Sequence, residues 1–148
     1  MRPLEHSLPL KLLMAREAVM ERFRPHLQAA GVTEQQWRVF RALCETDEAE
    51  AGALAEAICL KMPSLSRILA DLSGEGLINR RNGTEDRRLR LVSITAKGRA
   101  LVEKMAPQSE AEYALIQNAV GAEAYAALMA DLQSAIDKLN SLNQAGPD

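Results

Sequence analysis

This 148-residue sequence lacks the side-chain constellations on which most enzymes depend. Histidine occurs only at His6 and His26, and there is no glycine-rich phosphate loop, no closely spaced Cys/His cluster and no nucleophile beside an obvious base. Acids such as Glu110 and Glu112 are two residues apart, which places them on different faces of a helix. We therefore expect no catalytic residues, no metal site and no cofactor.

Long apolar runs are also missing. No window is long and apolar enough to span a bilayer, and no signal-peptide core follows Arg2, Pro3 and Glu5. Hydrophobic residues still make up 47% of the chain, which favours one folded domain over a disordered chain. We expect a cytoplasmic protein with no membrane partner.

Cysteine is scarce. Cys44 and Cys59 both lie in apolar helix patterns, which favours buried, reduced thiols in a cytosolic protein. A redox-sensing pair is the alternative, and loss of function on oxidation that reductant reverses would identify it.

Charge of one sign is not in excess, because 20 Asp or Glu oppose 18 Lys or Arg. The charges are unevenly placed, however. Residues 61–104 hold ten basic against five acidic residues, whereas residues 105–148 hold one basic against six acidic residues. Since the local sign governs contact with a polyanion, a net charge of −2 does not exclude nucleic-acid binding by the basic segment.

The segment 54–98 has the order helix, turn, helix, basic hairpin. A short apolar helix pattern precedes a second helix that opens at Pro63 and ends near Gly74. Two strand-like runs then flank Asn82-Gly83, a strong turn dipeptide, and another helix follows. This is the order of a winged helix-turn-helix, which places one helix in the DNA major groove and the hairpin over the backbone or minor groove.

The second helix of this segment has two different sides. Leu65, Ile68, Leu69 and Leu72 form an apolar stripe at 100° per residue, while the opposite side is small and polar around Arg67. An ordinary amphipathic helix with a solvated face has the same pattern, and the basic hairpin favours the DNA-binding interpretation. The DNA contacts expected here come from Lys61, Pro63, Ser64, Ser66 and Arg67.

The hairpin is rich in arginine. Its five arginines are Arg80, Arg81, Arg87, Arg88 and Arg90. A charge run is usually only a solvated face, but crowded guanidinium groups repel one another unless anions are near, and Arg suits phosphate and narrow minor grooves. We expect Arg81, Arg87 and Arg88 to contact DNA and Asp86 to fix the wing arginines as an ion-pair partner. A protein-interaction module without DNA binding is the alternative, but its wing would more often carry aromatic residues.

Helical patterns flank this segment on both sides. Thr33 and Gln36 form a capping box, and Pro25 and Pro107 lie inside the outer helices, where we expect kinks. The first helix has an apolar stripe of Leu8, Leu12, Ala15, Val19, Phe23 and Leu27. The helix expected over 96–119 should turn Met105, Tyr113 and Ile116 inward, and the last helix carries Tyr125, Leu128, Leu132, Ile136, Leu139 and Leu142.

The last apolar stripe has little core of its own to pack on. Packing within one chain is one explanation, but a second copy is the partner that we expect. The predicted fold is mainly α with a small β-hairpin, in one domain over 1–148. Its winged helix-turn-helix covers about 33–97, and its dimerisation helices cover about 6–30 and 98–143. A two-fold dimer places two recognition helices about 34 Å apart and requires a near-palindromic double-stranded operator.

The residues from Gly76 to Gly98, GL-I-x-R followed by DRR and VSIT-x-x-G, resemble the MarR family of bacterial transcription regulators. LLMAREAVMERFRP at 12–25, TEQQWRVFRAL at 33–43 and PSLSRIL at 63–69 are similar to one branch, the repressors of hydroxyphenylacetate and homoprotocatechuate degradation operons. The lead CLKM at 59–62 departs from that branch, which leaves the base preference and the ligand open. The resemblance implies a homodimeric repressor that a phenolic acid releases from DNA.

An aromatic acid needs a cation for its carboxylate and an apolar slot for its ring. Arg16 lies among apolar neighbours on the first helix, and Trp37 and Arg38 lie near the start of the second. The resemblance places effectors at this junction. We expect Arg16 to pair with the effector carboxylate, Trp37 to wall the ring and Arg38 to line the site. A structural salt bridge of Arg16 is the alternative.

Overall fold

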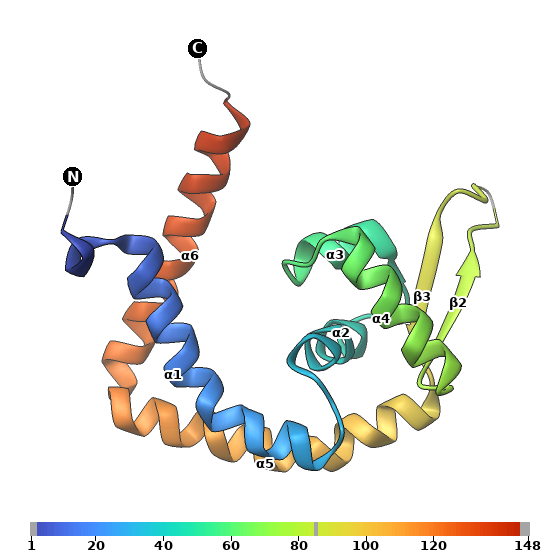
Figure 1. The fold of residues 1–148 in the computed structure, drawn as a ribbon, viewed down its shortest axis with the longest axis horizontal. Coiled ribbons are helices and arrows are strands. Elements are labelled where there is room, and N and C mark those ends of the chain that lie inside the picture. The colour runs from blue at the N-terminus through green and yellow to red at the C-terminus, as the bar shows by residue number, and fades with distance from the viewer. Residues whose placement is uncertain (1–2, 85, 146–148) are drawn as a thin grey trace. The chain divides into compact units, whose positions relative to one another are not determined.

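The computed structural model describes residues 3–84 and 86–145, which form helices and one small sheet (Figure 1). The elements are η1 (Leu4–His6), α1 (Leu8–Ala29), α2 (Glu34–Cys44), β1 (Ala49–Glu50), α3 (Ala51–Ala57), α4 (Met62–Gly74), β2 (Ile78–Asn82), β3 (Arg90–Ile94), α5 (Ala96–Val120) and α6 (Ala122–Gln144). This order confirms the mainly α fold with a winged helix-turn-helix. The chain divides into two compact units after Ser109, inside α5.

The core of the first unit is built by α2, α3, α4 and the sheet. Its fully buried apolar side chains include Phe40, Leu43, Leu65, Leu72, Ile78 and Val92. On α4, Leu65, Leu69 and Leu72 are buried and Ile68 is half-buried, which confirms the predicted core side of that helix. Each such burial stabilises the fold by about 1.5–3 kcal/mol relative to an exposed side chain. The orientation of α4 is therefore fixed by its leucines.

The sheet is antiparallel, with the strand order β1-β3-β2. Strand β1, of two residues, was not predicted. The hairpin β2–β3 is also wider than Asn82-Gly83 predicted, because Asn82 is paired with Arg90 and the Gly83 N–H donates to the Leu89 carbonyl at 2.9 Å. Gly83 lacks the positive φ that a two-residue turn demands. Its missing side chain matters because a Cβ there would lie 2.5 Å from the Asp86 carbonyl oxygen.

Three helices of this unit end in the same hydrogen-bonded turn. After α1 the left-handed residue is Gly31 (φ 68°), and after α4 it is Gly76 (φ 71°). After α3 the equivalent residue is Cys59 (φ 53°). At each end, the next residue donates to a carbonyl five positions back, at 2.9 Å. Glycine is the usual residue at this position because it has no Cβ to clash.

The base of the hairpin is anchored where α5 begins. The Thr95 hydroxyl donates to the carbonyls of Gly76 and Leu77, at 2.9 and 3.0 Å, and accepts from the Gly98 N–H at 3.0 Å. A Cβ at Gly98 would collide with the Leu77 carbonyl oxygen, which is backbone and cannot swing aside. Gly98 therefore holds α5 close against the hairpin.

We expect Gly98→Ala to lower the free energy of unfolding by about 1–3 kcal/mol, because the new methyl group overpacks this contact. Gly74→Ala is the matched control, since a Cβ there meets nothing within 4 Å. The control should be neutral or stabilising by up to about 1 kcal/mol. Urea unfolding followed by circular dichroism measures both, and equal effects of the two substitutions would contradict this account.

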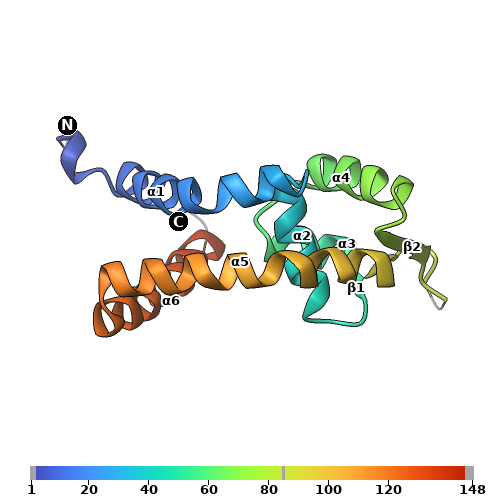
Figure 2. The ribbon, with the colours of Figure 1, turned by 90° about the horizontal axis from the view of Figure 1, so that it is seen from below.

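The outer helices are only partly buried in the single chain. Helices α1 and α5 both continue past their internal prolines, Pro25 and Pro107. The end of α1 lies beside α5, where His26 Nε2 and Ser109 Oγ are 3.1 Å apart (Figure 2). The exposed apolar residues of the first unit include Leu4, Leu8, Leu12, Leu13, Met14 and Val19.

In the second unit, the prediction that Tyr113 points inward is wrong for the single chain, because its side chain is exposed. Ile116 is half-buried, and no described residue of α6 is buried. Exposed apolar residues there include Leu115, Val120, Leu128, Met129, Ile136, Leu139 and Leu142. None of the described helices combines the length and the apolar character needed to cross a bilayer.

Candidate functional site

One candidate site is the outer face of α4. Lys61 is the N-cap residue of this helix, and Pro63 lies in its first turn. The N–H groups of a first turn have no partner within the helix, so proline, which has no N–H, costs no hydrogen bond there. All five residues predicted to contact DNA from here are exposed: Lys61, Pro63, Ser64, Ser66 and Arg67. Pro63, Ser64 and Ser66 are small enough to let the backbone approach DNA closely, and hydroxyl, ammonium and guanidinium donors suit phosphates and base edges.

A hollow of about 190 Å³ lies on this face, between α2 and α4. Gln35 lines it together with Pro63, Ser64, Arg67 and Ile68. Gln35 was not predicted, because a helical pattern does not show which face of α2 lies beside the start of α4. An amide, a hydroxyl and a guanidinium group gathered around one hollow are donors that a nucleic acid can use.

The wing arginines differ in their availability. Arg81 donates from Nε and Nη2 to the two carboxylate oxygens of Glu48, at 2.7 and 2.5 Å. This bidentate pair links β2 to the residues just before β1, and Glu48 was not predicted as a partner of Arg81. Arg87 and Arg88 are exposed and form no ion pair within the described part of the chain.

Asp86 does not form the ion pair that we expected. Its carboxylate Oδ1 accepts from the backbone N–H of Arg88 at 2.9 Å, and in the described residues it contacts no guanidinium group. A short acidic side chain readily bonds a backbone N–H two residues on, and here this bond shapes the loop between β2 and β3. Asp86 thus places the backbone that carries Arg88.

A second candidate site is an ion network between α1 and α2. Arg16 donates to Glu17 and to Glu34, both at 2.6 Å. Arg24 donates to Glu34 at 2.7 Å and to Glu17 at 2.5 Å. Hydrogen bonds from Arg24 hold the pKa of the Glu17 and Glu34 carboxyls below the usual range, and Arg16 acts in the same direction. Both carboxylates are therefore ionised at neutral pH, so two cations balance two anions.

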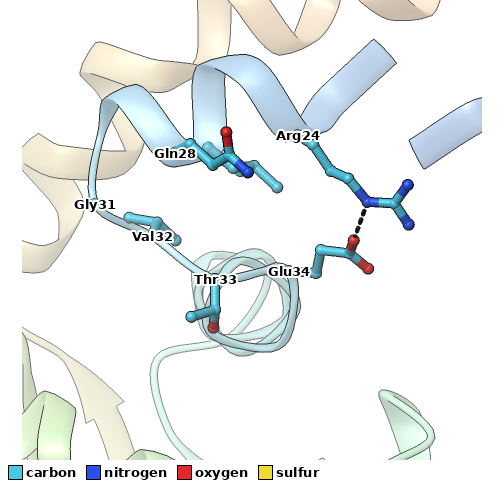
Figure 3. Close-up of a pocket in the computed structure, with 7 residues that line it drawn as sticks. Arg24, Gln28, Gly31, Val32, Thr33 and Glu34 are labelled. Carbon is cyan, nitrogen blue, oxygen red and sulfur yellow. Dashed lines mark hydrogen bonds and ion pairs between the residues drawn. The ribbon is translucent and has the colours of Figure 1, made fainter. Parts of the chain in front are cut away.

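A pocket of about 460 Å³ opens beside this network (Figure 3). Arg24 and Glu34 line it together with the end of α1 and the loop that follows: Leu27, Gln28, Gly31, Val32 and Thr33. Figure 3 shows the Arg24–Glu34 pair at the edge of the pocket. Two charged groups beside the apolar side chains of Leu27 and Val32 are the chemistry that a small amphipathic acid requires.

None of the three predicted effector residues is among those that line this pocket. Arg16 belongs to the ion network, so the salt bridge weighed as the alternative is present in this structure. Trp37 is buried. Arg38 is directed elsewhere, because its Nη1 donates to the Ile58 carbonyl at the end of α3, at 2.6 Å.

Glu17, Arg24 and Glu34 were not predicted as site residues. Glu17 and Arg24 are seven residues apart, which is two helical turns, so their opposite charges on one face were a readable signal. Glu34 lies in another helix, and nothing local indicated that it joins them.

The two cysteines are not bonded to each other in this structure. Both thiols are free, Cys44 is half-buried, and Cys59 is exposed, so the expectation of two buried thiols is wrong for Cys59. Among the described residues, no group of three His, Cys, Asp or Glu side chains is placed to hold a metal ion.

Comparison with known sequences places this architecture in a family. Residues 32–89 match the sequence profile of the MarR family. The chain is 36% identical over 138 residues to the HTH-type transcriptional regulator FarR of Neisseria gonorrhoeae, which covers 91% of this chain and 94% of that protein. It is 38% identical over 117 residues to the homoprotocatechuate degradative operon repressor of Escherichia coli, which covers 79% of each.

A solved structure agrees with these sequences. The crystal structure of NadR in complex with 4-hydroxyphenylacetate is 34% identical to this chain and superimposes with a TM-score of 0.80, over 92% of this chain and 96% of that one. MarR regulators bind DNA, dimerise and respond to small-molecule effectors, and they are not enzymes. This chain has a winged helix-turn-helix and relatives that match it over most of its length, and it belongs to the MarR family of transcription regulators.

Proposed function

We propose that this chain represses an operon for aromatic-acid catabolism and that a phenolic acid of the hydroxyphenylacetate or homoprotocatechuate type releases it from DNA. The observation that carries this proposal is its 38% identity to the homoprotocatechuate degradative operon repressor of Escherichia coli. The likeness to NadR with bound 4-hydroxyphenylacetate points to the same ligand class. The chain acts in the cytoplasm, where a regulator of this kind meets its DNA.

In this proposal α4 enters the major groove. Ser64, Ser66 and Arg67 face base edges, and Pro63 allows close approach of the backbone. Lys61 binds a phosphate at the entry to the groove. The support is that these side chains are exposed while the leucines of α4 hold the opposite face in the core.

The wing contacts the DNA backbone or minor groove through Arg87 and Arg88. Asp86 acts indirectly, through the backbone N–H of Arg88. Arg81 contributes least, because a contact with DNA would have to compete with its bidentate bond to Glu48.

The working unit is a homodimer of one-domain chains. The support is the apolar side chains left exposed on α1 and α6, which include Leu8, Leu12, Ile136 and Leu139. Two-fold symmetry then places the two copies of α4 about one turn of DNA, ~34 Å, apart. The operator is therefore nearly palindromic.

The effector carboxylate binds at the network between α1 and α2. A neutral set of two cations and two anions has no spare charge, so an acid must take Arg16 from Glu34 or Glu17. The ring lies in the neighbouring pocket, and Trp37 supports that wall from α2. Release follows if the acid binds best to a state in which the two DNA-binding faces are wrongly spaced.

The proposal is tested by selecting genomic DNA fragments that the purified protein binds and then adding a panel of phenolic acids. We expect fragments from the promoter of a ring-cleavage operon and release by 4-hydroxyphenylacetate or 3,4-dihydroxyphenylacetate. Benzoate and aliphatic acids of the same charge are the controls. Fragments without such genes, or release by none of the acids, would contradict the proposal.

The role of the wing is tested by Arg88→Ala. Loss of one phosphate contact should weaken operator binding and flatten the dependence of log affinity on log salt by about one unit. Fluorescence anisotropy over a salt series measures both quantities. Lys11→Ala, which removes an exposed charge from α1, should change neither. An unchanged slope in Arg88→Ala would remove Arg88 from the DNA interface.

A further inference from the structure

The turn between α3 and α4 is the least relaxed of the three helix ends described above. Cys59 adopts φ 53° there, and its N–H donates to the Glu56 carbonyl at 3.2 Å, while the Leu60 N–H donates to Ala55 at 2.9 Å. Helix α4 begins at Met62, three residues after Cys59. The direction of the proposed recognition helix therefore depends on this turn.

A residue with a side chain is strained in this conformation, because its Cβ approaches the following carbonyl oxygen. The turns after α1 and α4 avoid the strain by having Gly31 and Gly76. Strain of this kind persists only where the surrounding structure holds the backbone in place. The turn before α4 therefore needs outside support that the other two do not need.

Arg38 supplies a contact of that kind. Its Nη1 donates to the carbonyl of Ile58, the residue directly before Cys59, at 2.6 Å. A hydrogen bond from a charged guanidinium is short and strong, especially when partly buried. The Nε of Arg38 is buried and has no partner within the described residues, and no acid pairs with the side chain there. The bond to the Ile58 carbonyl is thus the polar contact that Arg38 makes in the described structure.

The same face of α2 also contacts α1. Glu34 precedes Arg38 by four residues, so the two lie one turn apart on one side of the helix. Glu34 accepts from Arg16 and Arg24 of α1. The capping box of Thr33 and Gln36 fixes the start of α2, where Glu34 lies. Glu34 and the Ile58 carbonyl are therefore joined by Arg38 and one turn of α2.

We propose that Arg38 is a positioning residue that holds the strained turn before α4 and couples it to the ion network at the start of α2. The proposal rests on the function proposed above, in which an acid competes for Arg16. The bound acid places its own carboxylate beside Glu34, which Arg24 still holds, and this added negative charge displaces the first turn of α2. Arg38 passes that displacement to the Ile58 carbonyl. Arg38 therefore sets the direction of α4 without touching DNA or effector.

The local part of the proposal is tested by hydrogen exchange in the free, full-length protein. Arg38→Met keeps the length of the apolar stem and removes every donor. Amides of residues 59–62 should exchange about tenfold faster or more in this variant, the factor expected for one lost hydrogen bond to a charged group. The amides of residues 39–43, in the core of α2, should keep the parent rate. Arg38→Lys, which keeps one charged donor, should restore much of the protection.

Two controls keep this test interpretable. Arg99→Met removes an exposed arginine of α5 and should leave exchange in 59–62 unchanged. Thermal melts show whether Arg38→Met folds, and Arg38→Gln takes its place if it does not. Parent-like exchange of residues 59–62 in the folded variant overturns the proposal.

The coupling is tested with DNA. Arg38→Met should bind operator about tenfold or more weakly while its affinity for non-operator DNA stays within about twofold, because only the aim of α4 has changed. The factor by which 4-hydroxyphenylacetate weakens operator binding should shrink toward one. Faster exchange with an undiminished effector response overturns the coupling. If no phenolic acid releases the parent protein, the function proposed above fails, and exchange together with operator affinity still decides the role of Arg38.

Discussion

Replacement of Arg67 by alanine should relax base preference at one position in each operator half-site. Arg67 is exposed on α4, and Leu65 and Leu69 hold the other side of the helix in the core. An arginine that binds a guanine edge through two donors supplies about 1–3 kcal/mol of discrimination against the wrong base. Affinity for the best operator should fall by that amount, while operators already changed at that position should lose little.

The measurement is a competition assay with operators that carry each of the four bases at every position. Arg67→Lys is the matched variant, because it keeps the charge and loses the planar fork. It should bind non-operator DNA like the parent and discriminate like the alanine variant. An equal loss of affinity on every DNA sequence would instead assign Arg67 to a phosphate.

Replacement of Arg16 by alanine should leave operator binding intact and abolish release by the effector. Arg16 donates to two carboxylates in the free chain, and its side chain is 48% exposed. Exposed pairs contribute at most about 1 kcal/mol, so the fold should tolerate the change. Arg24 still holds both Glu17 and Glu34 in the variant. Loss of the Arg16 cation should therefore weaken effector binding while the fold remains stable.

Titration of preformed operator complex with 4-hydroxyphenylacetate and 3,4-dihydroxyphenylacetate measures this effect. Lys11→Ala, another loss of positive charge on α1, is the control and should be released like the parent. If Arg16→Ala is released at the same effector concentration as the parent, Arg16 is only a structural ion pair. Arg24, which lines the pocket, then becomes the next candidate for the carboxylate.

The features that the sequence predicted are those that depend on neighbouring residues. The capping box of Thr33 and Gln36 is present with both of its hydrogen bonds. The stripe on α4 is buried as its periodicity indicated, because a period of 3.6 residues needs only the local chain. The exposure of Ser64 and Ser66 follows directly from that stripe.

The features that the sequence did not predict join residues far apart in the chain. Arg81 and Glu48 are 33 residues apart, and Arg38 and Ile58 are 20 apart. No periodic pattern encodes such pairs, because they depend on how the elements pack. The prediction of a tight turn at Asn82-Gly83 was wrong for a related reason. The pairing of β2 with β3 places Asn82 in a strand and not at the tip of the hairpin.

The central claim is that this protein is a DNA-binding repressor under the control of a phenolic acid. The most direct measurement is the anisotropy of a labelled operator fragment, selected from genomic DNA, during titration first with protein and then with 3,4-dihydroxyphenylacetate or 4-hydroxyphenylacetate. We expect saturable binding of one dimer per near-palindromic site, followed by full release as the acid is added. Binding that no phenolic acid reverses, or equal affinity for operator and scrambled DNA, would contradict the claim.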